Sequence, residues 1–141
     1  MLGLLAVACC GLFAGAALYI NAVEHPARMS GGVEHALRAF VPSSQRAAVM
    51  QALLAVMGGV AGVLTWALRG GLSYLVGALL LLAVVPFTLL VVLPTNKRLL
   101  ALHAQGDVGH AHELLQRWNG LHAVRTALSV AAFAVMLSGL R

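Results

Sequence analysis

The chain has 141 residues, of which 61% are apolar and 9% are charged, and its formal net charge is +5. Average soluble domains are roughly 45–50% apolar and about 25% charged. A mean hydropathy of +0.93 therefore excludes a soluble single domain, a disordered chain and a disulfide-stapled secreted fold. The lipid bilayer is the solvent that fits. No aromatic-interleaved basic stripe accompanies the positive charge, so we expect no nucleic-acid partner and assign the charge to membrane topology.

Four segments are predicted to cross the membrane, since a crossing of ~30 Å takes about 20 apolar helical residues. In chain order these spans are about 2–23, 46–68, 71–94 and 119–140. The fourth is the most informative, because its uncharged run covers only 126–140 and a full crossing must draw His122 and Arg125 into or just under the headgroup layer. The predicted fold is all-α: a single membrane domain over 1–141, built as a four-transmembrane-helix bundle with partly helical cytoplasmic connectors.

Glycine and proline mark close packing and breaks. Gly11–Gly15 and Gly58–Gly62 are G-x-x-x-G pairs, which let helices approach closely in lipid, either within the chain or between copies in a homo-oligomer. Pro42 is expected to end a short amphipathic helix in the first connector, and Pro86 to kink the third span.

The polar residues are distributed very unevenly between the two ends of such a bundle. All six histidines, all four acids and seven of the nine basic residues fall in the connectors 24–46 and 97–125. The positive-inside rule predicts that this end is cytoplasmic and that both termini lie outside. We expect an integral protein of a bacterial inner (plasma) membrane.

Polar groups of all four helices are expected to meet at one depth near that end. The first helix contributes Asn21, Glu24 and His25, the second Gln51, the third Asn96, and the fourth Trp118, His122 and Arg125. Spacings of three and four residues place each helix's members on one face. The sequence therefore predicts a polar pocket that opens to the cytoplasmic interface.

Several roles are open for these residues. Glu24 and Arg125 are interpreted either as a structural ion pair at the bundle mouth or as a substrate anchor. His25 and His122 suit hydrogen bonding, general-base catalysis, or metal binding together with Glu24 or Asn96, a set that would take copper or iron. Trp118, Gln51 and Asn21 are candidate substrate-binding residues. Local zinc, haem, nucleotide-binding and nucleophile-elbow motifs are missing from the sequence.

Three motifs resemble the anthrone oxygenase-like membrane family. They are Glu24-His25-Pro26-Ala27-Arg28, Pro94-Thr95-Asn96-Lys97-Arg98-Leu99-Leu100, and Trp118-x-x-x-His122-x-x-Arg125-Thr126. The resemblance implies a small four-span protein whose fungal relatives oxidise anthrones to anthraquinones without added flavin or nicotinamide. Carried over by position, it implies functional roles for Asn96, Trp118, His122 and Arg125. Many bacterial members have no assigned function.

The expected function is that of a membrane-embedded oxygenase that acts on an apolar aromatic molecule, anthrone- or quinol-like, at the cytoplasmic interface. In this interpretation His122 is the base, while Arg125 and Asn96 stabilise the developing oxyanion. With a metal, His25 and His122 would hold it, and oxygen activation would occur there. The alternative is a small non-enzymatic membrane protein that binds a quinone- or lipid-like ligand or braces a complex.

Overall fold

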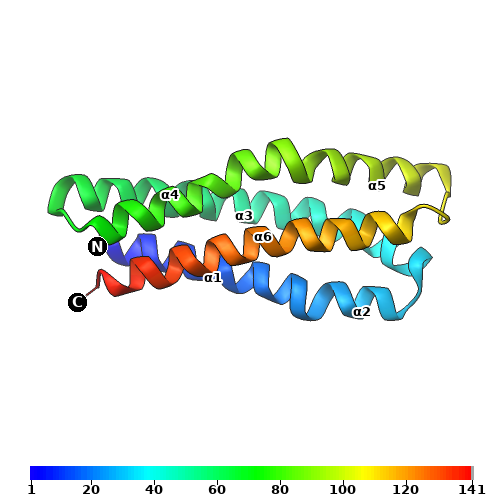
Figure 1. Ribbon diagram of the computed structural model, residues 1–141, viewed down its shortest axis with the longest axis horizontal. Helices are drawn as coiled ribbons and strands as arrows, with labels where there is room; N and C mark the ends of the chain where they lie inside the picture. The colour runs from blue at the N-terminus through cyan, green and yellow to red at the C-terminus, as the bar shows by residue number, and fades with distance from the viewer. Residues whose placement is uncertain (141) are drawn as a thin grey trace.

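The computed structural model describes residues 1–140, which form one elongated bundle of helices (Figure 1). The elements are α1 (Leu2–Tyr19), the π-helical turn η1 (Ile20–Glu24), α2 (His25–Ser30), α3 (Val33–Arg69), α4 (Leu72–Phe87), a second π-helical turn η2 (Thr88–Val92), α5 (Leu93–Gln105) and α6 (Ala111–Ser138). Because η1 and η2 continue their neighbours, residues 1–140 make four helical segments, each long and apolar enough to cross a membrane. The all-α four-helix prediction is confirmed.

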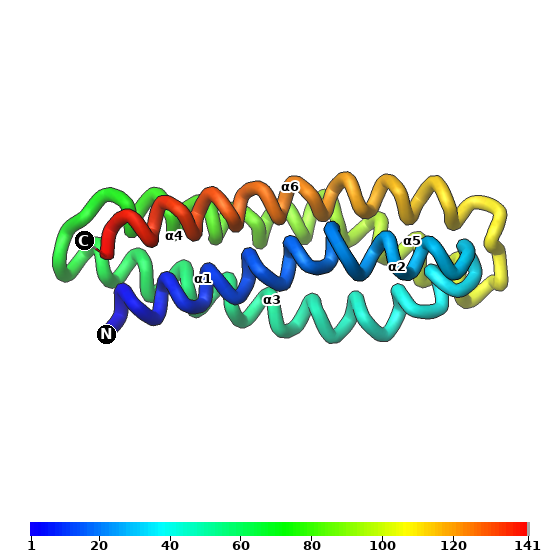
Figure 2. The backbone as a smooth tube through the Cα atoms, turned by 90° about the horizontal axis from the view of Figure 1, so that it is seen from below, coloured from blue at the N-terminus to red at the C-terminus, as the bar shows by residue number. Residues whose placement is uncertain are grey.

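The two ends of the bundle differ in character. Both termini and the α3–α4 turn lie at one end, and the two polar turns lie at the other (Figures 1 and 2). The turn at Gly70 and Gly71 has positive φ angles of 78° and 89°, a conformation that costs glycine little. We call this the terminal end and the opposite one the polar end.

The helices are much longer than the hydrocarbon is thick. At ~1.5 Å per residue the 37 residues of α3 extend about 55 Å, against ~30 Å of hydrocarbon. The predicted connectors are therefore mostly continuations of the spans. Pro42 does not end a helix as expected: it is exposed within α3. The neighbouring hydroxyl of Ser43 donates to the Ala39 carbonyl at 2.9 Å, and buried Leu37 and Phe40 hold this part of α3 against the bundle.

Two separate apolar clusters make up the core. The terminal cluster joins α1, α3, α4 and α6, and its buried members are Ala6, Val7, Cys10, Phe13, Ala17, Ala55, Ala61, Tyr74, Ala78, Leu81, Val84, Ala132 and Met136. The polar-end cluster consists of buried Ile20, Ala36, Leu37, Phe40, Val92, Leu99, Ala111, Leu115 and Trp118. Between them lies a layer that contains most of the buried polar side chains.

Close helix approach in the terminal cluster depends on the second glycine pair. A Cβ at Gly58 would lie 3.0 Å from the Cβ of Cys9, and one at Gly62 would lie 2.9 Å from the Cβ of Ala78. This pair therefore packs α3 against α1 and α4 inside one chain. Gly15 has open space around it, and pairing between copies through that face stays a prediction.

Candidate functional site

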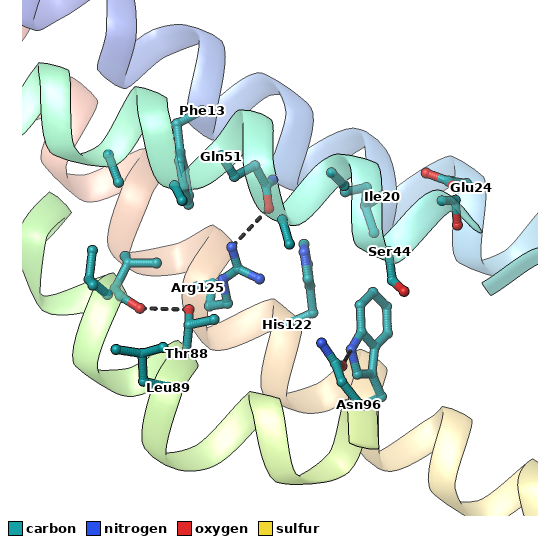
Figure 3. A pocket seen from close by; sticks show the side chains of 18 of the residues that line it. Phe13, Ile20, Glu24, Ser44, Gln51, Thr88, Leu89, Asn96, His122 and Arg125 are labelled. Atoms are coloured by element: carbon teal, nitrogen blue, oxygen red, sulfur yellow. Dashed lines mark hydrogen bonds between the residues drawn. The ribbon is translucent and has the colours of Figure 1, made fainter. Parts of the chain in front are cut away.

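The layer between the two apolar clusters contains a cavity of about 120 Å³ (Figure 3). Its polar lining comes from every long segment, as the sequence predicts: Glu24, Arg28, Ser43, Ser44, Gln51, Thr88, Asn96, Trp118, His122 and Arg125. The rest of the wall is apolar and includes Phe13, Ile20, Ala52, Val85 and Leu89. Gln51 lies eighteen residues before Arg69, about 27 Å from the terminal end. Because Gln51 is the middle residue of α3, the cavity lies about midway along this helix.

Arg125 is held by a neutral partner. Its Nη2 donates to Gln51 Oε1 at 2.8 Å, and the guanidinium lies over the ring of Phe13 at 5.7 Å. Both polar side chains are buried, at 7% and 1% exposure. Within residues 1–140, Arg125 Nε and Gln51 Nε2 are buried nitrogens without a hydrogen-bond partner. Both residues line the cavity, so a cationic side chain and two unpartnered N–H groups lie in or directly behind its wall.

The predicted pairing of Glu24 with Arg125 is wrong. Glu24 instead forms an ion pair with Arg28, one helical turn further along, at 3.1 Å. The first span was expected to end near Val23, whereas Pro26 lies inside one continuous helical segment, directly after the π-helical turn η1. The helix continues to Ser30 and brings Arg28 beside the carboxylate.

His122 is oriented by a chain of amides. Asn21 Nδ2 donates to the backbone carbonyl and to Oδ1 of Asn119, at 3.0 and 2.7 Å. Two oxygen partners identify that atom as the amide nitrogen, so Asn21 Oδ1 is the acceptor that faces His122 Nδ1 at 3.0 Å. Nδ1 must carry the proton in the neutral ring, which leaves Nε2 as the basic nitrogen. Thr126 Oγ1 donates to the same Oδ1.

Trp118 divides the polar layer into two parts. Its Nε1 donates to Asn96 Oδ1 at 2.6 Å, so Asn96 contributes its amide nitrogen to the cavity as a remaining donor. The indole centroid lies 4.8 Å from that of His122 and 6.0 Å from that of His25, with ring planes inclined by 32° and 30°. Phe40 contacts the indole edge-on at 5.0 Å. His25 lies outside the cavity lining.

The predicted metal ligands do not come together. Among residues 1–140, no group of three or more His, Cys, Asp or Glu side chains lies close enough to hold a metal ion. His122 Nδ1 is occupied by Asn21, Glu24 is engaged with Arg28, and His25 packs on Trp118. As arranged here, the set of His25, His122 and Glu24 therefore does not fit copper or iron, because the three side chains are not gathered around one point, although Nε2 of His122 is free.

The remaining site residues lie partly where they are expected. Gln51, Asn96, Trp118, His122 and Arg125 line the cavity, whereas Asn21 does not; Asn21 holds His122 from behind. Sequence reasoning missed Asn119 and Thr126, although their spacing from His122 by three and four residues marks one face of α6. It also missed Arg28 as a buried residue, although Arg28 follows Glu24 by four positions.

Comparisons with known proteins identify the family of this chain. The family model described as "Anthrone oxygenase" matches residues 1–135. The chain belongs to the anthrone oxygenase family. Two curated relatives from fungi are anthrone oxygenase tpcL of Aspergillus fumigatus, 42% identical over 59 residues, and anthrone oxygenase dmxR16 of Cryptosporiopsis sp., 33% identical over 70 residues. These alignments cover 40% and 48% of this chain and only 37% and 41% of the relatives' own lengths. No solved structure matches this anthrone oxygenase family member.

Proposed function

We propose that this chain is a membrane-embedded oxygenase that oxidises an apolar aromatic molecule, anthrone- or quinol-like, through an enolate. One observation carries the proposal: the cavity-lining residues Arg28, Gln51 and Arg125 each keep at least one buried N–H group without a hydrogen-bond partner. Buried donors that lack acceptors bind a ligand that supplies oxygen acceptors. The apolar wall of the same cavity suits the hydrocarbon body of that ligand.

The first step is proton removal by His122. An anthrone carries an acidic CH₂ group opposite its carbonyl, and His122 Nε2, whose other nitrogen is held by Asn21, takes one of these protons. The C–H electron pair moves into the ring system, and negative charge develops on the carbonyl oxygen. Arg125 Nε, Gln51 Nε2 and the Asn96 amide are the donors for that oxyanion. In a water-poor site such donors lower the barrier most where charge develops.

Molecular oxygen then serves as the oxidant. The electron-rich carbon transfers an electron to O₂, the two radicals combine into a C–O bond, and the proton on His122 passes to the outer oxygen to give a hydroperoxide. Loss of the second C–H proton with cleavage of the O–O bond releases water and leaves a carbonyl. Anthrone plus O₂ thus becomes anthraquinone plus water. All electrons come from the substrate, so this route uses no flavin, nicotinamide or metal.

We further propose that the polar end faces the cytoplasm, supported by the seven of nine basic residues in the two connectors. The site would then lie just inside the cytoplasmic boundary of the bilayer. The substrate is proposed to be a lipid-soluble molecule, and the lipid bilayer itself is the partner that the exposed leucine and valine side chains of the spans require.

The test is turnover of anthrone by protein in lipid nanodiscs. O₂ uptake and the rise in anthraquinone absorbance measure the rate, and the rate of uncatalysed autoxidation is subtracted. His122→Ala should lower the enzymatic rate about 10²–10⁴-fold, the usual contribution of a general base. His103→Ala, a solvent-exposed histidine of α5, is the matched control and should keep full activity.

Two further results decide between the alternatives. His25→Ala should retain turnover, whereas loss of activity together with loss of a stoichiometric copper or iron would favour the metal mechanism instead. Saturable binding of anthrone without O₂ uptake by the wild-type protein would overturn the oxygenase proposal and favour a ligand-binding protein.

A further inference from the structure

We infer that the ligand reaches the cavity sideways from the lipid, through an opening between α3 and η2 bordered by Ala48, Ala52 and Leu89. This inference deepens the proposed function, because it defines the substrate as a molecule that first dissolves in the bilayer. It rests on where the cavity lies, on the shape of the backbone beside it, and on the size of the side chains at its edge.

Packed apolar side chains lie along the bundle axis on both sides of the cavity. Toward the termini, Phe13, Leu81 and Val84 are at most 1% exposed and belong to the terminal cluster. Toward the polar end, Phe40 and Leu99 are fully buried in the second cluster. A ligand that came along the bundle axis would have to separate one of these packed cores, which are as dense as organic crystals. The remaining direction is between neighbouring helices.

The backbone bends away from α3 at the level of the cavity. Pro86 lies near the end of α4 and cannot donate a hydrogen bond to the Leu82 carbonyl, and the π-helical turn η2 follows directly. Thr88 Oγ1 donates to the Val84 carbonyl at 2.7 Å, a side-chain bond that helps to stabilise such a bend. Figure 1 shows the chain from α4 to α5 bowing outward here. α3 packs on α4 and on α5, but it touches η2 much less.

Small side chains leave the gap unfilled on the opposite side. On α3, Ser44, Ala48 and Ala52 follow one another at intervals of four residues and all line the cavity. Ala48 and Ala52 are also exposed on the outside of the bundle. Across the gap, Leu89 lines the cavity while 57% of it is exposed. Residues that belong to both the cavity wall and the outer surface mark an opening. Of Ala48, Ala52 and Leu89, only Leu89 has a bulky side chain.

The opening faces acyl chains. Ala52 lies seventeen residues before Arg69, and Leu89 lies seventeen residues after Leu72, so both are about 26 Å from the terminal end. That depth is within the ~30 Å of hydrocarbon. The opening leads to Gln51 and Arg125, each more than nine-tenths buried with an unpartnered nitrogen. A planar apolar molecule with a carbonyl oxygen fits this route, whereas a permanently charged one does not.

The experiment uses Trp118 as the reporter. The chain has two tryptophans, so Trp66→Phe leaves Trp118, which lines the cavity, as the only one. The protein is reconstituted in phosphatidylcholine vesicles and titrated with menadione, a lipid-soluble quinone that quenches indole fluorescence. Anthraquinone-2,6-disulfonate, a planar quinone that stays in water, is the matched second probe. We expect saturable quenching by menadione and at least tenfold weaker quenching by the disulfonate.

Two variants test the opening itself. Ala52→Phe should reduce menadione quenching at least fivefold by filling the gap, and Leu53→Phe, on the lipid-facing surface of the same helix and outside the cavity wall, should not. Leu89→Ala should speed the onset of quenching, which keeps the test decisive if Ala52→Phe fails to fold. Equal quenching by both quinones, or quenching insensitive to both Ala52→Phe and Leu89→Ala, would overturn the inference.

The readout separates this inference from the proposed function, since quenching requires no turnover. Quenching that depends on the opening, in a protein that does not oxidise anthrone, would refute the oxygenase and leave the lipid route standing. If Ala52→Phe changed neither anthrone oxidation nor quenching, the lipid route would be refuted and the oxygenase proposal would stand.

Discussion

Replacing Arg125 should separate stability from activity. An arginine that is buried against a carboxylate costs about 3–5 kcal/mol to remove, because the acid is left unpaired. Here the partner is Gln51, and removing both groups together as Arg125→Met/Gln51→Leu leaves neither atom stranded. We therefore expect the double variant to unfold at a temperature close to that of the wild type, while anthrone turnover falls about 10²–10³-fold through loss of the oxyanion donors.

The magnitude follows from opposing contributions at this site. The double variant loses a hydrogen bond to a charged group, about 1.5–3 kcal/mol, and a cation–π contact with Phe13, about 0.5–2 kcal/mol. It gains at most about 2.5–3.5 kcal/mol, the cost of a cation at the centre of a span, because Arg125 lies thirteen residues before Ser138, some 20 Å from the terminal end. The two sides cancel to within about 2 kcal/mol.

The assay is thermal unfolding in nanodiscs beside anthrone turnover. Leu81→Ala, at a fully buried position, shows that the measurement detects a loss of about 2–5 kcal/mol. If the double variant is destabilised as much as Leu81→Ala, Arg125 is a structural residue and the reasoning is refuted. Arg125→Lys retains the charge without the Nε donor, and we expect it to recover only part of the rate.

Three other predictions are smaller in scope. Asn21→Leu should leave the buried Nδ1 of His122 unpaired, lower stability by about 1–3 kcal/mol and reduce kcat more than it changes KM; unchanged kcat would exclude a positioning role for Asn21. Single cysteines at Ser30 and Gln105, both exposed at the polar end, should react with a membrane-impermeant maleimide only from the cytoplasmic side, and labelling from outside in intact cells would reverse the proposed orientation. In the α5–α6 turn, a hydrogen bond from His110 and a second one from the Gly109 N–H lower the pKa of Asp107. The stabilising contribution of this carboxylate is therefore present near neutral pH and is lost as the pH falls through that pKa. Carboxyl NMR should give a titration midpoint below the ordinary value of about 3.9.

Composition and periodicity predict the fold of this protein, and the depth of polar residues predicts most of the cavity wall. Gln51, Asn96, His122 and Arg125 were identifiable because a polar group near the end of an apolar span is unusual in lipid. The hydrogen-bond partners of these four residues could not be identified from the sequence. Whether Arg125 meets Glu24 or Gln51 depends on helix rotation, which residue spacing within one helix does not determine.

The π-helical turns explain much of what sequence reasoning missed. A π turn differs from an α turn by one hydrogen-bond register over five residues, and no apolar periodicity can be recognised over so short a length. Both turns begin six residues before a proline, Pro26 or Pro94. The expected spans end near residues 23 and 94, whereas here the helices continue beyond both prolines.

Each π turn also acts as a one-residue insertion that changes the phase of its helix. An α-helix advances about 100° per residue, so the surplus residue of η1 lets α1 present one stripe to the terminal cluster and α2 a differently directed stripe to Trp118 and Phe40. Deleting Val23 would restore a regular helix and turn His25 and Arg28 by about 100° relative to α1. The apolar half of the bundle would keep its packing while the polar half lost its alignment. Adding or removing one residue in a π turn therefore changes the rotation of one half of the bundle relative to the other.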